Sequence, residues 1–468
     1  MESRMRLALL LSACLLALPA SASETRIPAE ALAAAGELRE RALADTTGHA
    51  LVESLTTEIG PRLAGSEADA RAVEWAKARF AELGYDRVWT EPVTFPKWER
   101  RSESARVLGA HAQPLVITAL GGSPGGTVEA EIVRFSDYAA LEAAPAGSLV
   151  GKIAFVDYRM ARTRDGSGYD AAGPVRSRGP SVASSKGAIG YLMRSVGTSP
   201  HRVANTGMTR FAEGVAPIPA AAMSLPDADQ LGRLLQRGPV QVRLALDVGF
   251  NGEYTSQNVI GEITGSELPD EYVVLANHLD SWDLGTGAID DASGVGITLA
   301  AGHLIGQMPQ RPKRSIRVIA FANEEQGLIG ARQYVERHAA DIGKHVIAAE
   351  SDFGAGRIYG FSSNAPEYAQ AAVRQVAEAL APLGIEHLPG QGGPGPDLIP
   401  LAQAGGTWAW LGQDGTHYFD LHHNADDTLD KVDPDDIAQN VAAYAVFAYL
   451  TAQAEGGFGS AAKDHASD

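Results

Sequence analysis

The stretch EYVVLANHLDSWDLGTGAIDDASGVGITLAAGHLIGQM, residues 271–308, sets the pattern for the second half of the chain. Its first residues, 271–277, form an apolar run that predicts a buried strand, and 293–308 predicts a helix. Four aspartates and a histidine crowd the glycine-rich turn between them. A polar loop of turn-forming residues would account for this turn in isolation, so the neighbouring segments decide what it does.

Two further strand–helix pairs follow this stretch. A predicted strand at 315–322 precedes a predicted helix at 328–339, and a strand at 345–351 precedes a helix at 366–384. Strands that alternate with helices are typical of a sheet whose faces are both covered by helices. The sequence therefore predicts an α/β fold with a mostly parallel central sheet and helices on both faces.

The flanking segments extend this domain on both sides. Residues 27–58 are rich in Ala, Leu and Glu and predict helix, Ser66 is the expected N-cap of a helix that stops at Gly84, and 86–95 predicts a strand. The last helix is expected to start at Asp433 as N-cap with Pro434 at its first position, and to run to about 454.

The texture of the chain changes between these two parts. Short apolar runs separated by Gly-, Pro- and Ser-rich loops predict a β-rich domain at 100–248, and PVQVRLAL at 239–246 alternates with a period of two. We therefore expect a main domain built from 23–99 and 249–455, interrupted by an inserted domain at 100–248. The tail, 456–468, is expected to be disordered.

The N-terminus predicts export. A mildly basic start, a short apolar run and the small residues of ASA at 20–22 are typical of a secretory signal peptide at 1–22, with a mature chain that begins near Ser23. Lipidation of Cys14 is the alternative, although another apolar run follows it. Cys14 is the single cysteine, so the mature chain has no disulfide. We expect a periplasmic or extracellular protein without a membrane span.

Composition narrows the function classes further. The 468 residues are 45% hydrophobic and 21% charged, which are globular values. A net charge of −18 argues against nucleic-acid binding, which requires a surplus of Lys and Arg, and against a polybasic membrane anchor.

Polar residues gather at the predicted ends of successive strands. Because functional residues of open α/β sheets collect at the carboxyl ends of the strands, these clusters are expected to meet. The clusters are His278, Asp280 and Asp290; Asn323, Glu324 and Glu325; Glu350 and Asp352; and His422 and His423. Imidazole and carboxylate ligands without thiolate favour zinc, and also accommodate manganese or cobalt. A carboxylate between two cations can bridge them, and one of two adjacent glutamates would be free to accept a proton from bound water.

Several segments also resemble a known family. They are GPRLAGS (60–66), HLDSWD (278–283), GAIDD (287–291), RPKRSIR (311–317), EEQG (324–327), ESDFG (350–354) and HHNADDT (422–428). This set resembles the co-catalytic di-zinc exopeptidases, which include secreted bacterial aminopeptidases and the glutamate carboxypeptidases. The likeness covers about 250–455 and reaches upstream through GPRLAGS. The inserted segment resembles a protease-associated domain, which interrupts the peptidase domain at the same place.

The resemblance implies a site with two zinc ions per chain. The five implied ligands are His278 and Asp352 for one metal, Glu325 and His423 for the other, and Asp290 as the bridge. His423 is preferred to His422 because the family motif places the ligand four residues before the Asp of DT, here Asp427.

The resemblance also assigns roles around the metals. Glu324 would be the general base, and Asp280 would accept a hydrogen bond from the His278 ring and fix its tautomer. Tyr418 is a candidate donor to the oxyanion. Two departures from the family pattern are visible: Asn277 stands where glycine is usual and Asn323 where alanine is common.

The expected activity is hydrolysis of dipeptides or short peptides with a free N-terminus, by a water that two metals activate. The carboxylate-rich ligand set suits an ammonium group, and no arginine beside the motifs after 270 obviously awaits a C-terminal carboxylate. The alternatives are carboxypeptidase action, a single-zinc transferase of the glutaminyl cyclase kind, and a non-catalytic receptor-like relative. The number of bound metals per chain would distinguish these classes: two for a peptidase, one for the transferase and none for the receptor-like relative. The relatives also imply a homodimer.

Overall fold

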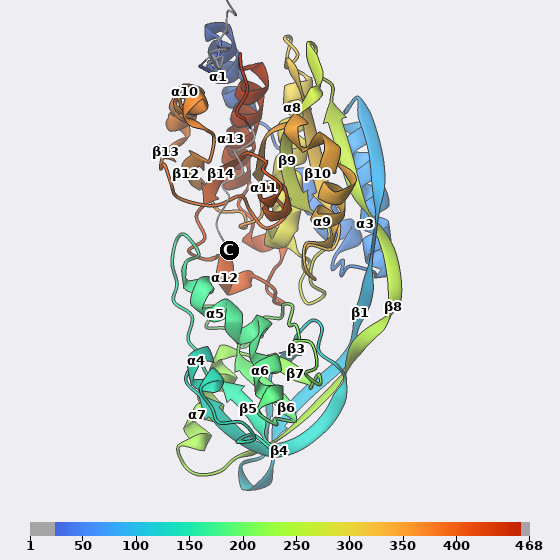
Figure 1. Cartoon of the computed structure of the whole chain (residues 1–468), viewed down its shortest axis with the longest axis vertical. Coiled ribbons are helices and arrows are strands. Elements are labelled where there is room, and N and C mark those ends of the chain that lie inside the picture. Colours follow the sequence, from blue (N-terminus) through green and yellow to red (C-terminus); the bar gives the residue numbers. More distant parts are fainter. Residues whose placement is uncertain (1–23, 460–468) are drawn as a thin grey trace, which may run out of the picture.

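The computed structural model describes residues 24–459. The predicted signal peptide, Ser23 and residues 460–468 lie outside this range. Figure 1 shows a larger lobe of helices around a sheet and a smaller lobe at its foot. The lobes are joined by two long antiparallel strands, β1 (Arg87–Val107) and β8 (Gln241–Ile263).

The sheet of the larger lobe runs in the order β13-β12-β14-β11-β9-β10-β8. Its other strands are β9 (Leu268–His278), β10 (Arg314–Phe321), β11 (His345–Glu350), β12 (Ile358–Ser363), β13 (Glu386–His387) and β14 (Trp408–Gln413). β10, β9, β11 and β14 are parallel, whereas β8 and β12 pair antiparallel with their inner neighbours. The predicted parallel sheet is therefore confirmed at its centre, and its flanks are antiparallel.

Helices cover both faces of this sheet. They are α1 (Ala29–Leu43), α2 (Thr47–Ser54), α3 (Glu67–Glu82), α8 (Ser293–Gly306), α9 (Ile329–Arg337), α10 (Gln370–Leu380), α11 (Ile399–Gln403), α12 (Tyr418–Leu421) and α13 (Pro434–Gln453). The largest apolar core joins α1, α2, α3, α8, α10 and α13 to one face, and a smaller core joins α9 and α11 to the other. This confirms the α/β layering expected from the strand–helix alternation.

The predicted helix starts are confirmed by their caps. The Ser66 hydroxyl accepts a hydrogen bond from the Asp69 N–H at 3.1 Å, ahead of α3. The Asp433 carboxylate accepts one from the Asp435 N–H at 2.8 Å, and Pro434 opens α13. Each side chain satisfies a backbone donor that the helix itself leaves free.

The smaller lobe has the strands that the sequence predicted, but it also contains helices that the sequence did not predict. Its strands are β2 (Gln113–Leu115), β3 (Ile117–Ala119), β4 (Gly126–Phe135), β5 (Ile153–Val156), β6 (Gly190–Arg194) and β7 (Ala220–Met223), and its helices are α4 (Tyr138–Glu142), α5 (Gly168–Ser177), α6 (Gly179–Ser185) and α7 (Leu225–Leu235). Strands β4 to β7 are parallel neighbours, so the lobe is a mixed α/β unit. Helices α5 and α6 contain Gly and Pro, which hid them in the sequence.

The lobe boundaries fall inside long strands. β1 was expected to end at residue 95 but pairs with β8 as far as Val107, so the positions 100 and 248 lie within one continuous ribbon. At the other end Phe458 is fully buried, so the chain is packed beyond residue 455. Within 24–459, no helix has the length and apolarity needed to cross a membrane.

Candidate active site

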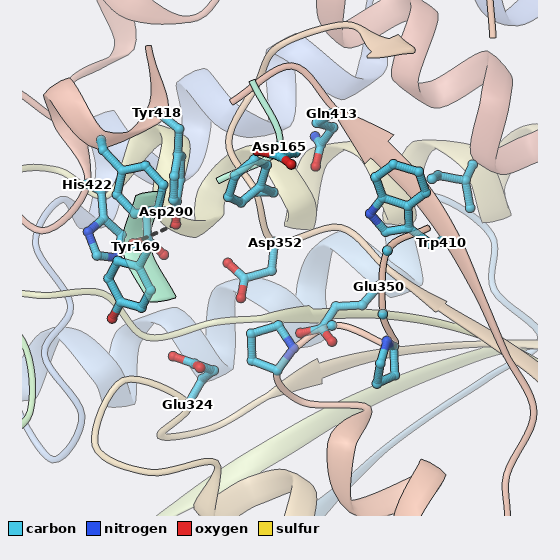
Figure 2. Close-up of a pocket in the computed structure, with 18 of the residues that line it drawn as sticks. Asp165, Tyr169, Asp290, Glu324, Glu350, Asp352, Trp410, Gln413, Tyr418 and His422 are labelled. Carbon is cyan, nitrogen blue, oxygen red and sulfur yellow. Dashed lines mark hydrogen bonds and ion pairs between the residues drawn. The ribbon is translucent and has the colours of Figure 1, made fainter. Parts of the chain in front are cut away.

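The polar strand ends converge as the parallel register requires. His278 ends β9 and stands opposite Phe321 at the end of β10, so the glutamate pair at 324–325 follows directly beside it. Glu350 ends β11 opposite Ala276 of β9, which brings Asp352 to the same edge. Figure 2 shows Asp290, Asp352 and Glu324 around one part of a common cavity.

Two histidines face each other across Asp290. His278 Nε2 lies 3.1 Å from Asp290 Oδ1 and 3.3 Å from Asp352 Oδ1. His423 Nε2 lies 3.2 Å from Asp290 Oδ2 and 2.9 Å from Glu325 Oε2. All five side chains are at least nine-tenths buried. The structure thus brings together all five residues that the resemblance implied as ligands, with Asp290 between two imidazole–carboxylate pairs.

His422 and His423 both approach this centre. Their rings stack at 3.4 Å, and His422 also lies within metal-sharing distance of Asp290 and His423. However, His422 Nε2 is 3.9 Å from the Asp290 carboxylate, whereas His423 contacts both Asp290 and Glu325 more closely. The geometry therefore favours His423 as the ligand and leaves His422 beneath it.

The donor set fits a metal cation. Burial raises the pKa of Glu325 and of Asp352, as expected for carboxylates crowded away from water. Burial would also raise the pKa of Asp290, but hydrogen bonds from His278 and His423 hold it well below its usual value. Glu325 Oε1 is buried and has no hydrogen-bond partner within the described chain. An anionic, water-poor group of nitrogen and oxygen donors with an unused oxygen suits zinc.

Asp280 lies beside the His278 ring, as the resemblance implied. The His278 Nδ1 atom lies 3.1 Å from the main-chain carbonyl of Asp280 and 3.8 Å from its carboxylate. The carbonyl is therefore the nearer acceptor in this structure, and a hydrogen bond to the carboxylate stays a prediction. The carboxylate accepts a hydrogen bond from the Glu324 N–H at 3.0 Å, so Asp280 positions the proposed base.

Three residues that support the site were not assigned a role from the sequence. Asp291 accepts hydrogen bonds from the His278 and Gly294 N–H groups, at 3.2 and 3.0 Å. Asp427 accepts one from the Ile289 N–H at 2.7 Å. Both aspartates belong to quoted motifs, but the partner of Asp427 lies 138 residues away, which no motif indicates.

The third supporting residue is Arg62, which is fully buried against the turn between β9 and α8, residues 279–292. Its guanidinium donates to the carbonyls of Leu279, Thr286 and Gly287 at 2.6, 2.7 and 3.0 Å. Burial lowers the pKa of Arg62, against the pull of the aspartates around it. The motif GPRLAGS thus contributes a fixed cation that ties both ends of the turn together.

The departures at Asn277 and Asn323 have visible consequences. Asn277 Nδ2 donates to Thr298 Oγ1 at 2.7 Å, which links β9 to α8. Asn323 adopts a left-handed backbone with φ of 56°, a conformation that Asn tolerates better than most residues. Neither side chain displaces one of the five proposed ligands.

A cavity of about 970 Å³ opens beside the five residues, and both lobes line it. The Tyr418 hydroxyl reaches into it and donates to Asp290 Oδ2 at 3.3 Å (Figure 2). Helix α5 of the smaller lobe contributes Tyr169 and Arg176, and Glu350 and Trp410 lie at the far end. Arg176 was missed because it stands in a loop-like stretch about 100 residues before the motifs.

Comparisons with known proteins identify the family of this chain. Residues 258–448 match the model of peptidase family M28. The chain is 34% identical to mouse carboxypeptidase Q over 406 residues, which cover 85% of this chain and 84% of that protein. It also matches the structure of a peptidase M28 precursor from Shewanella amazonensis with 48% identity and a TM-score of 0.88, over 90% of this chain and 97% of that one.

A zinc aminopeptidase from Bacillus subtilis shares the fold alone, at 20% identity and a TM-score of 0.62 over 86% of this chain and 94% of that one. The sheet, the carboxylate–imidazole cluster and these relatives together define a metallopeptidase. The chain belongs to peptidase family M28.

Proposed function

We propose that this chain is a zinc-dependent exopeptidase that binds two zinc ions and removes the first residue from dipeptides and short peptides. The observation that carries the proposal is the symmetric placement of His278 with Asp352 and of His423 with Glu325 on either side of Asp290. These five residues would hold the metals, with Asp290 shared between them. When bound, the zinc ions supply a water of lowered pKa and polarise the scissile carbonyl.

Glu324 is the proposed base. It lines the cavity, and its N–H is anchored to Asp280 while its side chain has no hydrogen-bond partner among the described residues. Glu324 accepts the proton of the attacking water and passes it to the leaving amine. The Tyr418 hydroxyl, already in the cavity, donates to the oxygen of the carbonyl under attack.

Arg176 supports dipeptides as the preferred substrates. Among the described residues that line the cavity it is the one arginine or lysine, and it is about nine-tenths buried. Its guanidinium contacts the Tyr169 hydroxyl, and Nη1 lies 3.5 Å from His423 Nδ1. A buried guanidinium this close to the reacting centre would pair with the C-terminal carboxylate of a two-residue peptide. The site would thus recognise both ends of a dipeptide.

Three forms of one dipeptide test this proposal. The free dipeptide should be hydrolysed much faster than its N-acetyl form, and a chelator should abolish hydrolysis until zinc is returned. Arg176→Met should raise KM for the free dipeptide by about tenfold to a hundredfold, the value of a charged hydrogen bond, and leave the C-terminal amide nearly unaffected. Equal rates on free and acetylated substrates would exclude aminopeptidase action, and a faster acetylated substrate would indicate a carboxypeptidase.

Three further parts of the proposal rest on the sequence. We infer that the smaller lobe is of the protease-associated type, that the protein is exported, and that it forms a homodimer. Light scattering of the purified protein measures the last of these. Zinc analysis separates a two-metal peptidase from a one-zinc transferase and from a metal-free relative.

A further inference from the structure

The smaller lobe holds the histidine segment of the larger lobe by its main chain. The Thr206 N–H donates to the His423 carbonyl at 2.9 Å, and Asn205 Nδ2 donates to the His422 carbonyl at 2.6 Å. The Thr198 N–H donates to the Phe419 carbonyl at 3.0 Å. Three hydrogen bonds from the smaller lobe therefore end on main-chain carbonyls within the five-residue span 419–423 of the larger lobe.

The same contact fixes the ring of His423. Its Nδ1 lies 3.3 Å from the Thr206 carbonyl oxygen, while its Nε2 faces Glu325 and Asp290. A ring that donates from Nδ1 to a carbonyl keeps Nε2 free as a lone-pair donor. His278 shows the same relation to the Asp280 carbonyl, but that acceptor lies in its own loop. The acceptor for His423 comes from the other lobe.

The His423 backbone also needs an external restraint. Its φ is 61°, in the left-handed region, where a residue other than glycine is disfavoured and persists only when its surroundings hold it. The Thr206 N–H donates a hydrogen bond to the carbonyl of this residue. The main chain of Thr206 thus contacts both the backbone and the ring of His423, and Arg176 of the same lobe also approaches the ring, with Nη1 3.5 Å from Nδ1.

Asn205 and Thr206 are themselves rigidly built into that lobe. Asn205 is 1% exposed and its N–H donates to Ser195 Oγ at 2.9 Å. A Cβ on Gly197 would lie 2.8 Å from Asn205 Oδ1, so glycine leaves the room that this amide requires. The Thr206 hydroxyl donates to the Ala119 carbonyl at 2.7 Å. The contact is therefore preformed on the side of the smaller lobe.

We propose that Asn205 and Thr206 position His423 and thereby set the affinity of the metal position that Glu325 and His423 share. The smaller lobe is then part of the metal centre as well as a wall of the cavity. This inference rests on the proposed two-zinc function, but it concerns binding and is tested without substrate. Asn205 and Thr206 are positioning residues, because they act on the metal through a histidine.

Titration of metal-free protein with zinc and with cobalt tests the inference. Asn205→Ala removes the amide, and Asn205→Leu keeps its approximate shape without charge but removes the donor. Each should weaken one of two metal positions by about tenfold to a hundredfold, as loss of a partner behind a ligand does, and leave the other unchanged. Thr209→Val is the matched control, because Thr209 is equally buried in the same segment but its hydroxyl bonds within the lobe, to Ser177.

The Glu325→Gln variant identifies the affected position. Its remaining metal position should bind with the same affinity whether or not Asn205→Ala is added. Unchanged affinities in both Asn205 variants, or an equal loss at both positions, would overturn the inference, and so would the same loss in Thr209→Val. Wild-type protein that binds no metal would instead contradict the proposed function.

Histidine ¹⁵N NMR of the zinc-loaded wild type tests the tautomer independently of any variant's stability. The signal of His423, assigned by its absence in His423→Gln, should show a proton on Nδ1 that exchanges slowly with water. An unprotonated Nδ1 would contradict the role of the Thr206 carbonyl.

Discussion

Asp290 lies between two imidazoles and is surrounded by other buried carboxylates. Such crowding is costly in the absence of cations, and burial raises the pKa of several neighbours, including Glu324 and Asp352. The tasks proposed for the two adjacent glutamates follow from their contacts: Glu325 reaches His423 at 2.9 Å, whereas the Glu324 side chain faces the cavity. Chemistry at this scale is decided by which side chain each carboxylate meets.

The division of labour between the two glutamates predicts different variant phenotypes. Glu324→Gln keeps the shape but cannot accept a proton, so kcat should fall by about a hundredfold to ten-thousandfold while zinc content is retained. Glu325→Gln should lose zinc as well as activity. Peptidase assays and zinc analysis of the same preparations measure both effects. A Glu324→Gln enzyme with most of its activity would show that another residue is the base.

Arg62 predicts a stability effect at the residue scale. Arg62→Met leaves the carbonyls of Leu279 and Thr286 without their donor, whereas the Gly287 carbonyl keeps the Ala292 N–H at 3.0 Å. The free energy of unfolding should fall by about 2 kcal/mol or more, since each unsatisfied buried acceptor costs about 1–3 kcal/mol. Urea unfolding measures this, with Arg71→Met as the control, because Arg71 donates to the Ile59 carbonyl at the surface. Equal losses in the two variants would contradict the role of Arg62.

At the scale of elements, parallel pairing of β9, β10 and β11 brings their carboxyl ends together. Asp291 then couples the end of β9 to the start of α8, because it accepts from His278 and Gly294. A Cβ on Gly294 would lie 2.3 Å from the Asp291 carboxylate, so only glycine permits this close approach. Strand ends and helix starts are thus locked around one loop.

His345, the first residue of β11, is expected to make the stability of the protein depend on pH. Burial lowers the pKa of His345 to about 4, and the nearby Arg317 adds to the shift. His345 is therefore neutral in the folded state, whereas in the unfolded chain it gains a proton below about pH 6.5. Its contribution is intact above that pH and is lost as the pH falls from about 6.5 toward 4.

Between pH 7 and pH 5 the free energy of unfolding should fall by about 2 kcal/mol through this residue. Urea unfolding of metal-free protein at both pH values measures the loss. His345→Gln cannot titrate and should show a correspondingly smaller loss between the two pH values. The same pH dependence in wild type and variant would rule out His345 as its source.

At the scale of the whole molecule, the ribbon of β1 and β8 joins the smaller lobe to the larger one (Figure 1), and both lobes contribute residues to the lining of the cavity. An ion pair of 2.9 Å between Arg100 of β1 and Asp283, in the turn between β9 and α8, also joins the lobes. A substrate enclosed in this way meets groups from distant parts of the chain. The size of the cavity, about 970 Å³, suits short peptides.

Export is a property of the whole chain, and the N-terminus of the mature protein tests it. We expect mass spectrometry of the exported form to show a chain that begins near Ser23, because the basic, apolar and small-residue segments end there. A mature chain that begins at a lipid-modified Cys14 would instead indicate a lipoprotein.

The sequence by itself determined the layered α/β fold and the set of candidate ligands. Apolar periodicity and capping residues such as Ser66 and Asp433 are local signals, and they were sufficient to locate most helices and strands of the larger lobe. Ligand candidates could be listed because parallel strands present their carboxyl ends at one edge. Gly- and Pro-containing helices such as α5 lack a clear period and were missed.

Only the tertiary structure decided which partner each polar group meets. Arg62 lies 217 residues from Leu279, and Asn205 lies 217 residues from His422, yet each pair is joined by a hydrogen bond. The same holds for Arg176 beside His423, and for the Asp280 carbonyl, which lies nearer to His278 Nδ1 than the expected carboxylate does. Local patterns report burial and backbone preference, because these depend on neighbours in the sequence. Contacts between the lobes depend on how the long ribbon of β1 and β8 bends and packs. No local sequence pattern encodes which residues this packing brings together.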